Sequence, residues 1–212
     1  MKILNLYAGI GGNRKLWQNA DVTAVEINPS IAAIYKDFYP NDKMIIGNAH
    51  EYLIEHYNEF DFIWSSPPCP THSKTNFFNH IKPRFPDMQL YEEVIFLQHF
   101  AKAGMLWIVE NVKSYYEPLV KPQETARHFL WSNFKITDIG ITKKVRNDAG
   151  YNLAKKMEER GIIITDFHGY KGDKRQLLNN AIEPELGLHI MNCALGSAVP
   201  EPIGLFENES SK

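Results

Sequence analysis

Residues 3–12 read Ile-Leu-Asn-Leu-Tyr-Ala-Gly-Ile-Gly-Gly, an apolar run that passes directly into a glycine-rich turn. The run predicts a short buried strand, and we expect a helical stretch from the turn to Trp17. Glycine lets the backbone pass close to a ligand because it has no Cβ atom. The third glycine of a dinucleotide-binding turn is replaced by Arg14. The turn therefore suits an adenosine-containing ligand without a pyrophosphate, such as S-adenosylmethionine; the alternative is a tight structural turn.

Strand and helix patterns alternate along the first half of the chain. Pro29 opens a helix with apolar residues at helical spacing, between apolar runs at 22–27 and 44–47. Strands that alternate with helices predict an α/β fold with a doubly wound, mostly parallel sheet of the Rossmann-like kind. Further strands are expected at residues 60–65 and 106–109, and further helices at about 50–57, 90–100, 153–160 and 175–195, the last interrupted at Pro184 and Gly187.

A glycine turn, a cysteine or a polar side chain follows or ends each of these predicted strands. The glycine turn follows the first strand, and Glu26 ends the second. Asn48, Cys69 and Glu110 follow the third, fourth and fifth strands. Ligands of parallel sheets bind at the carboxyl ends of the strands, so these residues are expected to meet in one site. A carboxylate such as Glu26 can accept hydrogen bonds there from the ribose hydroxyls of a nucleoside cofactor.

Two of these strand ends carry residues suited to covalent chemistry. Cys69 lies in the sequence Ser-Ser-Pro-Pro-Cys-Pro, where prolines fix the backbone and remove amide donors. A rigid turn at a strand end can present a nucleophile, although a free cysteine is more commonly a buried structural residue. Glu110 and Asn111 follow an apolar run, and burial disfavours the charged form of a carboxylate. Glu110 is therefore a candidate acid; alone, the Glu-Asn pair is more often a helix cap.

Composition narrows the class of protein. With 212 residues and 44% hydrophobic content, the chain can form one sizeable domain with a small insert. No apolar stretch approaches the ~20 residues of a membrane span, and the N-terminus has no signal-peptide pattern. The two cysteines imply no disulfide framework and favour a reducing cytoplasm.

The net charge of −2 argues against a highly basic nucleic-acid binder. The charged residues are nevertheless distributed unevenly along the chain. Residues 140–175 hold nine basic and five acidic side chains, which could face phosphates or form an ordinary solvated surface. We interpret residues 140–174 as a small insert with a strand-like run at 162–165. The catalytic domain would then consist of residues 1–139 and 175–212.

The chain resembles the DNA (cytosine-5) methyltransferases in an ordered set of motifs over roughly residues 1–139 and 175–206. The glycine turn resembles the first motif of that family, Glu26 its ribose-binding acid and Asn48 the position of its adenine-contacting Asp. The Gly-Ser-Ala-Val-Pro sequence at 196–200 resembles the segment that returns to the cofactor. The resemblance implies that S-adenosylmethionine is the cofactor, with contacts from Tyr7, Gly9, Gly11, Gly12, Glu26, Ile27, Asn48, Pro67, Ser197 and Val199.

The sequence also resembles the catalytic motifs of this family. The Pro-Pro-Cys sequence that ends at Cys69 resembles the nucleophile motif, and the Glu-Asn-Val sequence from Glu110 resembles the catalytic one. Of the two arginines in the arginine motif only Arg127 is present, with Thr125 at the other position. The resemblance implies that Cys69 adds to C6 of a flipped-out cytosine, that Glu110 hydrogen-bonds N3, and that Arg127 contacts O2. Asn111 completes the predicted catalytic set.

The resemblance also implies double-stranded DNA as the partner of a compact, monomeric modification enzyme from the cytoplasm of a prokaryotic or phage-infected cell. A mobile loop at residues 71–84 would close over the flipped base. The insert stands where the family keeps its target-recognition region, and its shortness predicts a short or loosely defined target site. DNA contacts are predicted for Ser73, Lys74, Lys143, Lys144, Arg146, Lys171 and Lys174.

Three other interpretations stay open. A few members of the family methylate tRNA with the same catalytic residues, and the sequence is compatible with that substrate. A catalytically inactive binding module would keep the fold, but the presence of Cys69, Glu110 and Arg127 argues against it. The Cys69-x-x-His72 spacing, with His80 nearby, is like that of a zinc site. No second Cys/His pair with suitable spacing follows, so we expect no metal.

Overall fold

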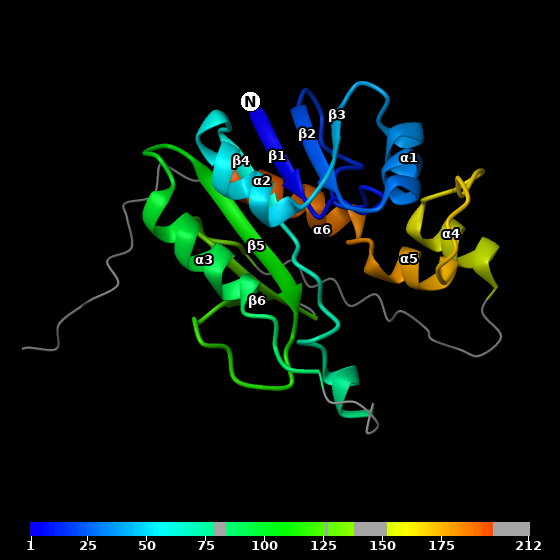
Figure 1. Ribbon diagram of the computed structural model, residues 1–212. Helices are drawn as coiled ribbons and strands as arrows, with labels where there is room; N and C mark the ends of the chain where they lie inside the picture. Colours follow the sequence, from blue (N-terminus) through cyan, green and yellow to red (C-terminus); the bar gives the residue numbers. More distant parts are fainter. Residues whose placement is uncertain (79–83, 126, 138–151, 197–212) are drawn as a thin grey trace, which may run out of the picture.

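Seven strands form one sheet in the computed structural model, which describes residues 1–78, 84–125, 127–137 and 152–196 (Figure 1). The strand order is β3-β2-β1-β4-β5-β7-β6. The strands are β1 (Lys2–Leu6), β2 (Asp21–Glu26), β3 (Lys43–Ile46), β4 (Phe62–Ser65), β5 (Leu106–Val112), β6 (Gln123–Thr125) and β7 (His128–Ser132). All pairs among β1 to β5 are parallel, whereas β7 is antiparallel to both β5 and β6. The predicted α/β fold with a mostly parallel, doubly wound sheet is confirmed.

The chain enters the sheet near its middle, at β1, and extends it in both directions. β2 and β3 lie on one side of β1, and β4 and β5 lie on the other. Leu6 is in register with Val25 of β2 and with Ser65 of β4, so the carboxyl ends of the three strands lie at the same level. The point where the winding reverses, between β1 and β4, is where open α/β sheets bind ligands.

Helices cover both faces of the sheet. Because side chains alternate along a strand, Leu4 and Ile63 pack toward α2 and α3, whereas Ile3 and Trp64 pack toward α6. The helices are α1 (Pro29–Phe38), α2 (Ala49–His56), α3 (Gln89–Phe100), α4 (Leu153–Arg160), α5 (Lys174–Asn180) and α6 (Pro184–Gly196), with short 3₁₀ helices η1 (Tyr57–Glu59) and η2 (Lys74–Phe78). None of the described helices is long and apolar enough to cross a membrane.

The prediction of a helix between the glycine turn and Trp17 is wrong, because residues 12–17 form a series of turns. Gly11 has a φ of +77°, which a right-handed helix does not accommodate. The amide of Asn13 donates to Oδ1 of Asn5 at 2.8 Å, which ties the segment back to β1. The segment packs instead against α6, where a Cβ on Gly187 would lie 2.3 Å from the backbone oxygen of Asn13.

Gly12 lies against the link between α5 and α6. A Cβ there would lie 2.4 Å from the backbone oxygen of Ile182 and 3.0 Å from Cβ of Ala181. We expect Gly12→Ala to lower the free energy of unfolding by about 2 kcal/mol, because a backbone atom cannot move aside as a flexible side chain can. Gly47→Ala is the control, since its Cβ would lie 3.9 Å from the nearest atom of Ile45. Chemical denaturation measures both, and equal stabilities of the two variants would contradict this close packing.

The antiparallel end of the sheet was not expected from the sequence. β6 and β7 form a hairpin, and β7 continues the ladder of β5 by pairing with residues from Ile108 to Val112. The fifth strand therefore does not end at residue 109 but continues to Val112. As a result, Glu110 and Asn111 lie inside a strand, where they pair with Leu130 and Phe129 of β7.

The C-terminal helices also differ from expectation. Pro184 does not break a helix but is the first residue of α6, where its missing N–H leaves no hydrogen bond unmade. Gly187 lies inside α6, at its contact with the glycine turn. Residues 162–165 form no strand. Their side chains at Ile162 and Ile164 instead join a core cluster that includes Ile34 of α1.

The described part of the predicted insert packs closely on the rest of the chain. Met157 of α4 shares its core cluster with Ile10 of the glycine turn and with Leu177 of α5. Residues 140–151 lie outside the described residues. The division into a catalytic domain and a target-recognition insert stays a prediction.

Candidate active site

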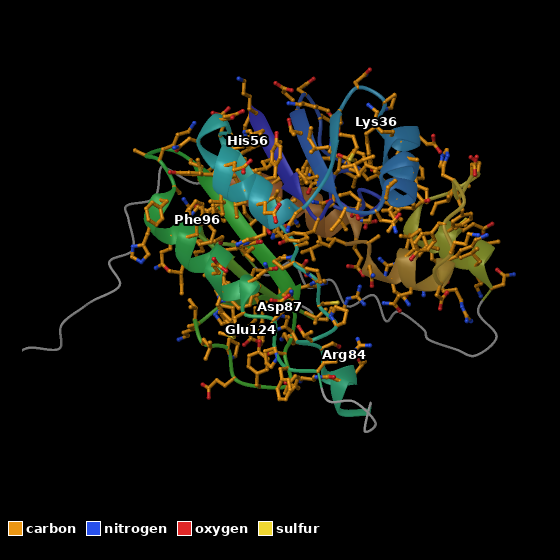
Figure 2. The ribbon with its side chains drawn as sticks, viewed as in Figure 1. Lys36, His56, Arg84, Asp87, Phe96 and Glu124 are labelled. Carbon is orange, nitrogen blue, oxygen red and sulfur yellow. The ribbon has the colours of Figure 1, made fainter. Side chains whose placement is uncertain are left out.

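The glycine turn, Glu26, Asn48, Cys69 and Glu110 lie at the carboxyl edge of the sheet. In Figure 1 the arrowheads of β1 and β5 point to this edge, and η2 extends beyond it. Figure 2 places Arg84 and Asp87, from the segment that leads into α3, near the same edge, whereas His56 and Phe96 lie away from it. The sheet therefore brings together residues that are far apart in the sequence.

Glu26 ties the glycine turn to the end of β2. Its Oε2 accepts a hydrogen bond from the backbone N–H of Gly9 at 3.0 Å, and its Oε1 accepts one from Asn28 at 2.9 Å. A carboxylate offers about four acceptor positions, so Glu26 keeps capacity for ribose hydroxyls. A Cβ on Gly9 would meet nothing within 4 Å, so the turn faces open space there. These residues fit a nucleoside ligand at this edge.

The other predicted cofactor-binding residues differ in their hydrogen bonds and in their exposure. Oδ1 of Asn48 accepts hydrogen bonds from two backbone N–H groups at 3.0 and 3.4 Å and so caps the start of α2. The position expected to contact adenine therefore has a structural role as well. The side chain of Ile27 is 70% exposed and is available to line a ligand. Ser197 and Val199 lie outside the described residues.

A buried carboxylate that the sequence analysis missed holds Tyr7 in place. Glu93 of α3 is 0% exposed and accepts hydrogen bonds from Oη of Tyr7 and Oγ of Ser65, each at 2.5 Å. Nδ1 of His50 lies 3.2 Å from the same carboxylate. Burial and the charge of Glu93 raise the pKa of Tyr7 above its ordinary value. Glu93 thus links β1, β4 and α2 beneath the site; a charged residue among the apolar positions of α3 was the available signal.

The turn that carries Cys69 is fastened to β5 and to its own following residues. Nδ2 of Asn111 donates a hydrogen bond to the backbone oxygen of Pro67 at 2.9 Å. The backbone oxygen of Cys69 accepts hydrogen bonds from the N–H groups of His72 and Ser73, both at 3.0 Å. Asn111, predicted to be catalytic, therefore acts in this structure by holding the nucleophile turn.

Cys69 itself is partly exposed, and charged residues from later in the chain lie near it. Burial raises the pKa of its thiol, and the negative charge of Glu110 raises it further. The backbone amide of Cys69 and the positive charge of Arg127 act in the opposite direction, and the net shift is upward. Glu110 and Arg127 thus both act on the thiol of Cys69.

Two further ionisable residues connect Glu110 with Arg127. Oε1 of Glu110 lies 2.5 Å from Nδ1 of His128, which is on the same face of the neighbouring strand β7. Nη2 of Arg127 donates to Oε1 of Glu183 at 2.8 Å, and Oε2 of Glu183 lies 3.7 Å from Nε2 of His128. The sequence analysis singled out neither His128 nor Glu183, although His128 stands inside the arginine motif.

The predicted DNA-contacting residues lie on separate elements. Ser73 is partly exposed and Lys74 is exposed, at the start of η2, which extends beyond the carboxyl edge. Lys171 and Lys174 are exposed near the start of α5. Lys143, Lys144 and Arg146 lie outside the described residues. A shared nucleic-acid surface for these residues stays a prediction.

The described residues include no group of three or more His, Cys, Asp or Glu side chains that could hold a metal ion. In the Cys69-x-x-His72 pattern, Nδ1 of His72 lies 2.5 Å from Oη of Tyr116, and the ring is buried. His80 of the same pattern lies outside the described residues.

The family model described as C-5 cytosine-specific DNA methylase matches residues 1–129. The chain belongs to this family. The matched part of the chain runs from β1 into β7, so it includes Cys69, Glu110 and Arg127. The family resemblance inferred from the order of the motifs is confirmed.

Two curated relatives in this family are tRNA (cytosine(38)-C(5))-methyltransferases. The human protein is 26% identical over 117 residues, a match that covers 47% of this chain and 30% of the relative. The Spodoptera frugiperda protein is 36% identical over 76 residues, covering 32% of this chain and 23% of the relative. The chain thus spans less than a third of the length of either relative.

Solved structures to which the chain is similar include a mutant of DNMT2 from Spodoptera frugiperda, at 28% identity and a TM-score of 0.37, covering 53% of this chain and 35% of that one. A putative DNA modification methyltransferase encoded within an Escherichia coli prophage is 16% identical with a TM-score of 0.41, covering 74% of this chain and 54% of that one.

Proposed function

We propose that the protein transfers a methyl group from S-adenosylmethionine to C5 of a cytosine in DNA, through a covalent adduct between Cys69 and C6. The observation that carries the proposal is the hydrogen bond that ties the turn of Cys69 to Asn111, the residue after Glu110, so that Glu110 and Arg127 both act on the Cys69 thiol. A nucleophile, a carboxyl group and a cation within reach of one base are the groups that this reaction requires. Family membership supports the same assignment.

The proposed reaction begins with the thiolate of Cys69. Its electron pair forms a bond to C6, the ring electrons move toward C5 and N3, and Glu110 hydrogen-bonds and protonates N3. Arg127 compensates the charge that develops at O2. After C5 has been methylated, its proton passes to solvent water, the C5–C6 double bond re-forms and the thiolate of Cys69 leaves. The proton on N3 then returns to Glu110. The hydrogen bond from Asn111 to Pro67 keeps the nucleophile turn in place throughout.

The cofactor would be held by the glycine turn and the end of β2. S-adenosylmethionine, when bound, supplies the sulfonium methyl group that C5 takes up. Glu26 would accept hydrogen bonds from the ribose hydroxyls, while Tyr7 and Ile27 would line the adenine side. Gly9 leaves the backbone accessible to the ligand because no side chain covers it.

We expect Glu26→Gln to weaken the binding of S-adenosylmethionine by about tenfold or more. The amide has only one acceptor oxygen, so either Gly9 or Asn28 loses its hydrogen bond and the ribose loses a charged partner. Isothermal titration calorimetry measures the dissociation constant. Glu159→Gln, on the exposed side of α4, is the control and should bind as the wild type does. Unchanged affinity of the Glu26 variant would contradict the assigned cofactor site.

Two nucleic acids, DNA and tRNA, are candidate substrates for this reaction. DNA follows from the description of the family, whereas the two curated relatives are named as tRNA methyltransferases, which favours tRNA as the second candidate. Incubation with radiolabelled S-adenosylmethionine and either DNA or tRNA, followed by nucleoside analysis, distinguishes them. We expect 5-methyl-2′-deoxycytidine from DNA. Label in 5-methylcytidine from tRNA alone would overturn the DNA assignment and support the second candidate.

The oligomeric state and the division of the chain into parts are included in this proposal. We propose a monomer whose residues 1–139 and 175–212 carry catalysis and whose residues 140–174 contact the nucleic acid. Lys171 and Lys174 are exposed, as phosphate contacts need to be. Replacement of both lysines by glutamate should weaken the binding of nucleic acid and leave the affinity for S-adenosylmethionine unchanged. That result would support the role.

A further inference from the structure

A buried histidine is enclosed by two carboxylates next to the proposed catalytic residues. His128 is 4% exposed and Glu110 is 6% exposed. Nδ1 of His128 lies 2.5 Å from Oε1 of Glu110, and its Nε2 lies 3.7 Å from Oε2 of Glu183. The imidazole therefore occupies one oxygen of Glu110 and leaves the other available to a base.

Four elements contribute the charged groups around this ring. Glu110 comes from β5, Glu183 from the residue before α6, Arg127 from the turn before β7, and Arg160 from the end of α4. Nε of Arg127 lies 3.4 Å from Nε2 of His128, and Nη2 of Arg160 lies 3.5 Å from Oε1 of Glu183. The thiol of Cys69 lies within range of Glu110 and Arg127 as well.

The balance of these groups favours the imidazolium form. Burial alone would lower the pKa of His128, but Glu110 and Glu183 outweigh burial and the charge of Arg127 and raise that pKa to about 9. Burial would raise the pKa of Glu183, yet His128, Arg127 and Arg160 lower it to about 2. Glu183 is therefore ionised at neutral pH and stabilises the cation on His128.

We propose that His128, held by Glu183, is a positioning residue that orients the carboxyl group of Glu110 and compensates its negative charge during the reaction. This inference rests on the proposed function. Glu110 carries a negative charge in the free protein. A proton taken up from solvent as the base binds is shared between Glu110 and cytosine N3, and the adjacent imidazolium stabilises the carboxylate that remains once N3 holds this proton. The proton returns to Glu110 when Cys69 leaves, and His128 keeps its own proton throughout.

The charge state of His128 can be measured without any substrate. NMR titration of the eight histidine side chains identifies His128 by the signal that is missing in His128→Gln. We expect this signal to titrate near 9 in the wild type and at lower pH in Glu183→Gln, because a stabilising charge is lost. A wild-type signal that titrates at the ordinary value of about 6.5 would overturn the inference.

The rate of covalent adduct formation with 5-fluorocytosine DNA tests the role in catalysis. In the wild type the rate should rise with pH as the ionised fraction of Cys69 grows, and should level off as the pH passes the pKa of His128, near 9. In His128→Gln the amide can still donate to Glu110 but has no proton to lose. We expect a rate about tenfold to a hundredfold lower at neutral pH, and no levelling off near pH 9. His128→Phe, which removes the donor, should be slower still.

The controls separate this inference from the proposed function. His56→Gln removes a histidine that lies 2.7 Å from Glu59 on the exposed surface and should leave the profile unchanged. In Glu183→Gln, which keeps both His128 and Glu110, the rate should level off at lower pH. A His128→Gln protein with the wild-type rate and the same levelling off near pH 9 would overturn the inference. Absence of any adduct from the wild type would instead refute the proposed function, and the NMR titration alone would then decide whether His128 carries the charge.

Discussion

Cys69→Ser is expected to lower the rate of methyl transfer by about 10⁴-fold or more, the scale seen when the nucleophile of a catalytic unit is removed. A serine hydroxyl is nearly isosteric with the thiol, but it ionises far less readily and attacks C6 poorly. The backbone of the turn is held by Asn111 and by hydrogen bonds to the oxygen of residue 69, so the fold should survive. Transfer of a radiolabelled methyl group to the nucleic acid under single-turnover conditions measures the loss.

Cys193→Ser provides a matched control. Cys193 lies on α6 with its Sγ 3.5 Å from Nε2 of His189, away from the residues assigned to catalysis. The same chemical change there should leave the rate within about twofold, as for other conservative substitutions outside a catalytic unit. If Cys69→Ser retained a rate close to that of the Cys193 control, the covalent mechanism would be wrong.

Glu110→Gln is expected to lower the rate constant of methyl transfer by about 10²- to 10⁴-fold, the usual contribution of a general acid. The glutamine oxygen can still accept the hydrogen bond from His128, so the side chain should keep its orientation. The amide cannot give a proton to N3, so the charge that follows attack by Cys69 is left uncompensated. The affinity for nucleic acid should change little, which places the loss in the chemical step.

Glu124→Gln on β6 is the control for this substitution. Glu124 is exposed and pairs with Lys113 at 2.8 Å, so its change tests the loss of a surface carboxylate near the same sheet edge. Its rate should stay close to that of the wild type, because exposed ion pairs contribute little. A Glu110→Gln rate within a few-fold of the Glu124 control would contradict the assigned acid.

The parallel half of the fold could be predicted because its signals are local. Each strand from β1 to β4 is a short apolar run next to a turn or helix start, and the residues that follow Leu6, Glu26 and Ser65 carry recognisable chemistry. The antiparallel end was missed because β6 has only three residues and is held by pairing with β7. Such pairing depends on register between distant segments, which no local pattern supplies.

The residues proposed for catalysis stand in motifs that the sequence makes visible, whereas their contacts with other residues could not be predicted. Cys69 and Glu110 stand in motifs that can be read from neighbouring residues. The link from Glu110 to His128 depends on the register of β5 and β7, and the link to Glu183 depends on how α6 packs. Glu93 was missed because its burial results from α3 packing over β1 and β4. Long-range contacts therefore determine the charges around a site whose reactive groups the sequence already indicates.

The central claim is that Cys69 forms a covalent bond with C6 of cytosine, and trapping with a fluorinated base tests it most directly. DNA that contains 5-fluorocytosine is incubated with the protein and S-adenosylmethionine; elimination from this base is blocked, so the adduct persists. We predict a stable adduct whose tryptic peptide, analysed by mass spectrometry, carries the base on Cys69, and no adduct from Cys69→Ser. An adduct on Cys193, or a folded, cofactor-binding protein that forms no adduct with fluorinated DNA or RNA, would contradict the claim.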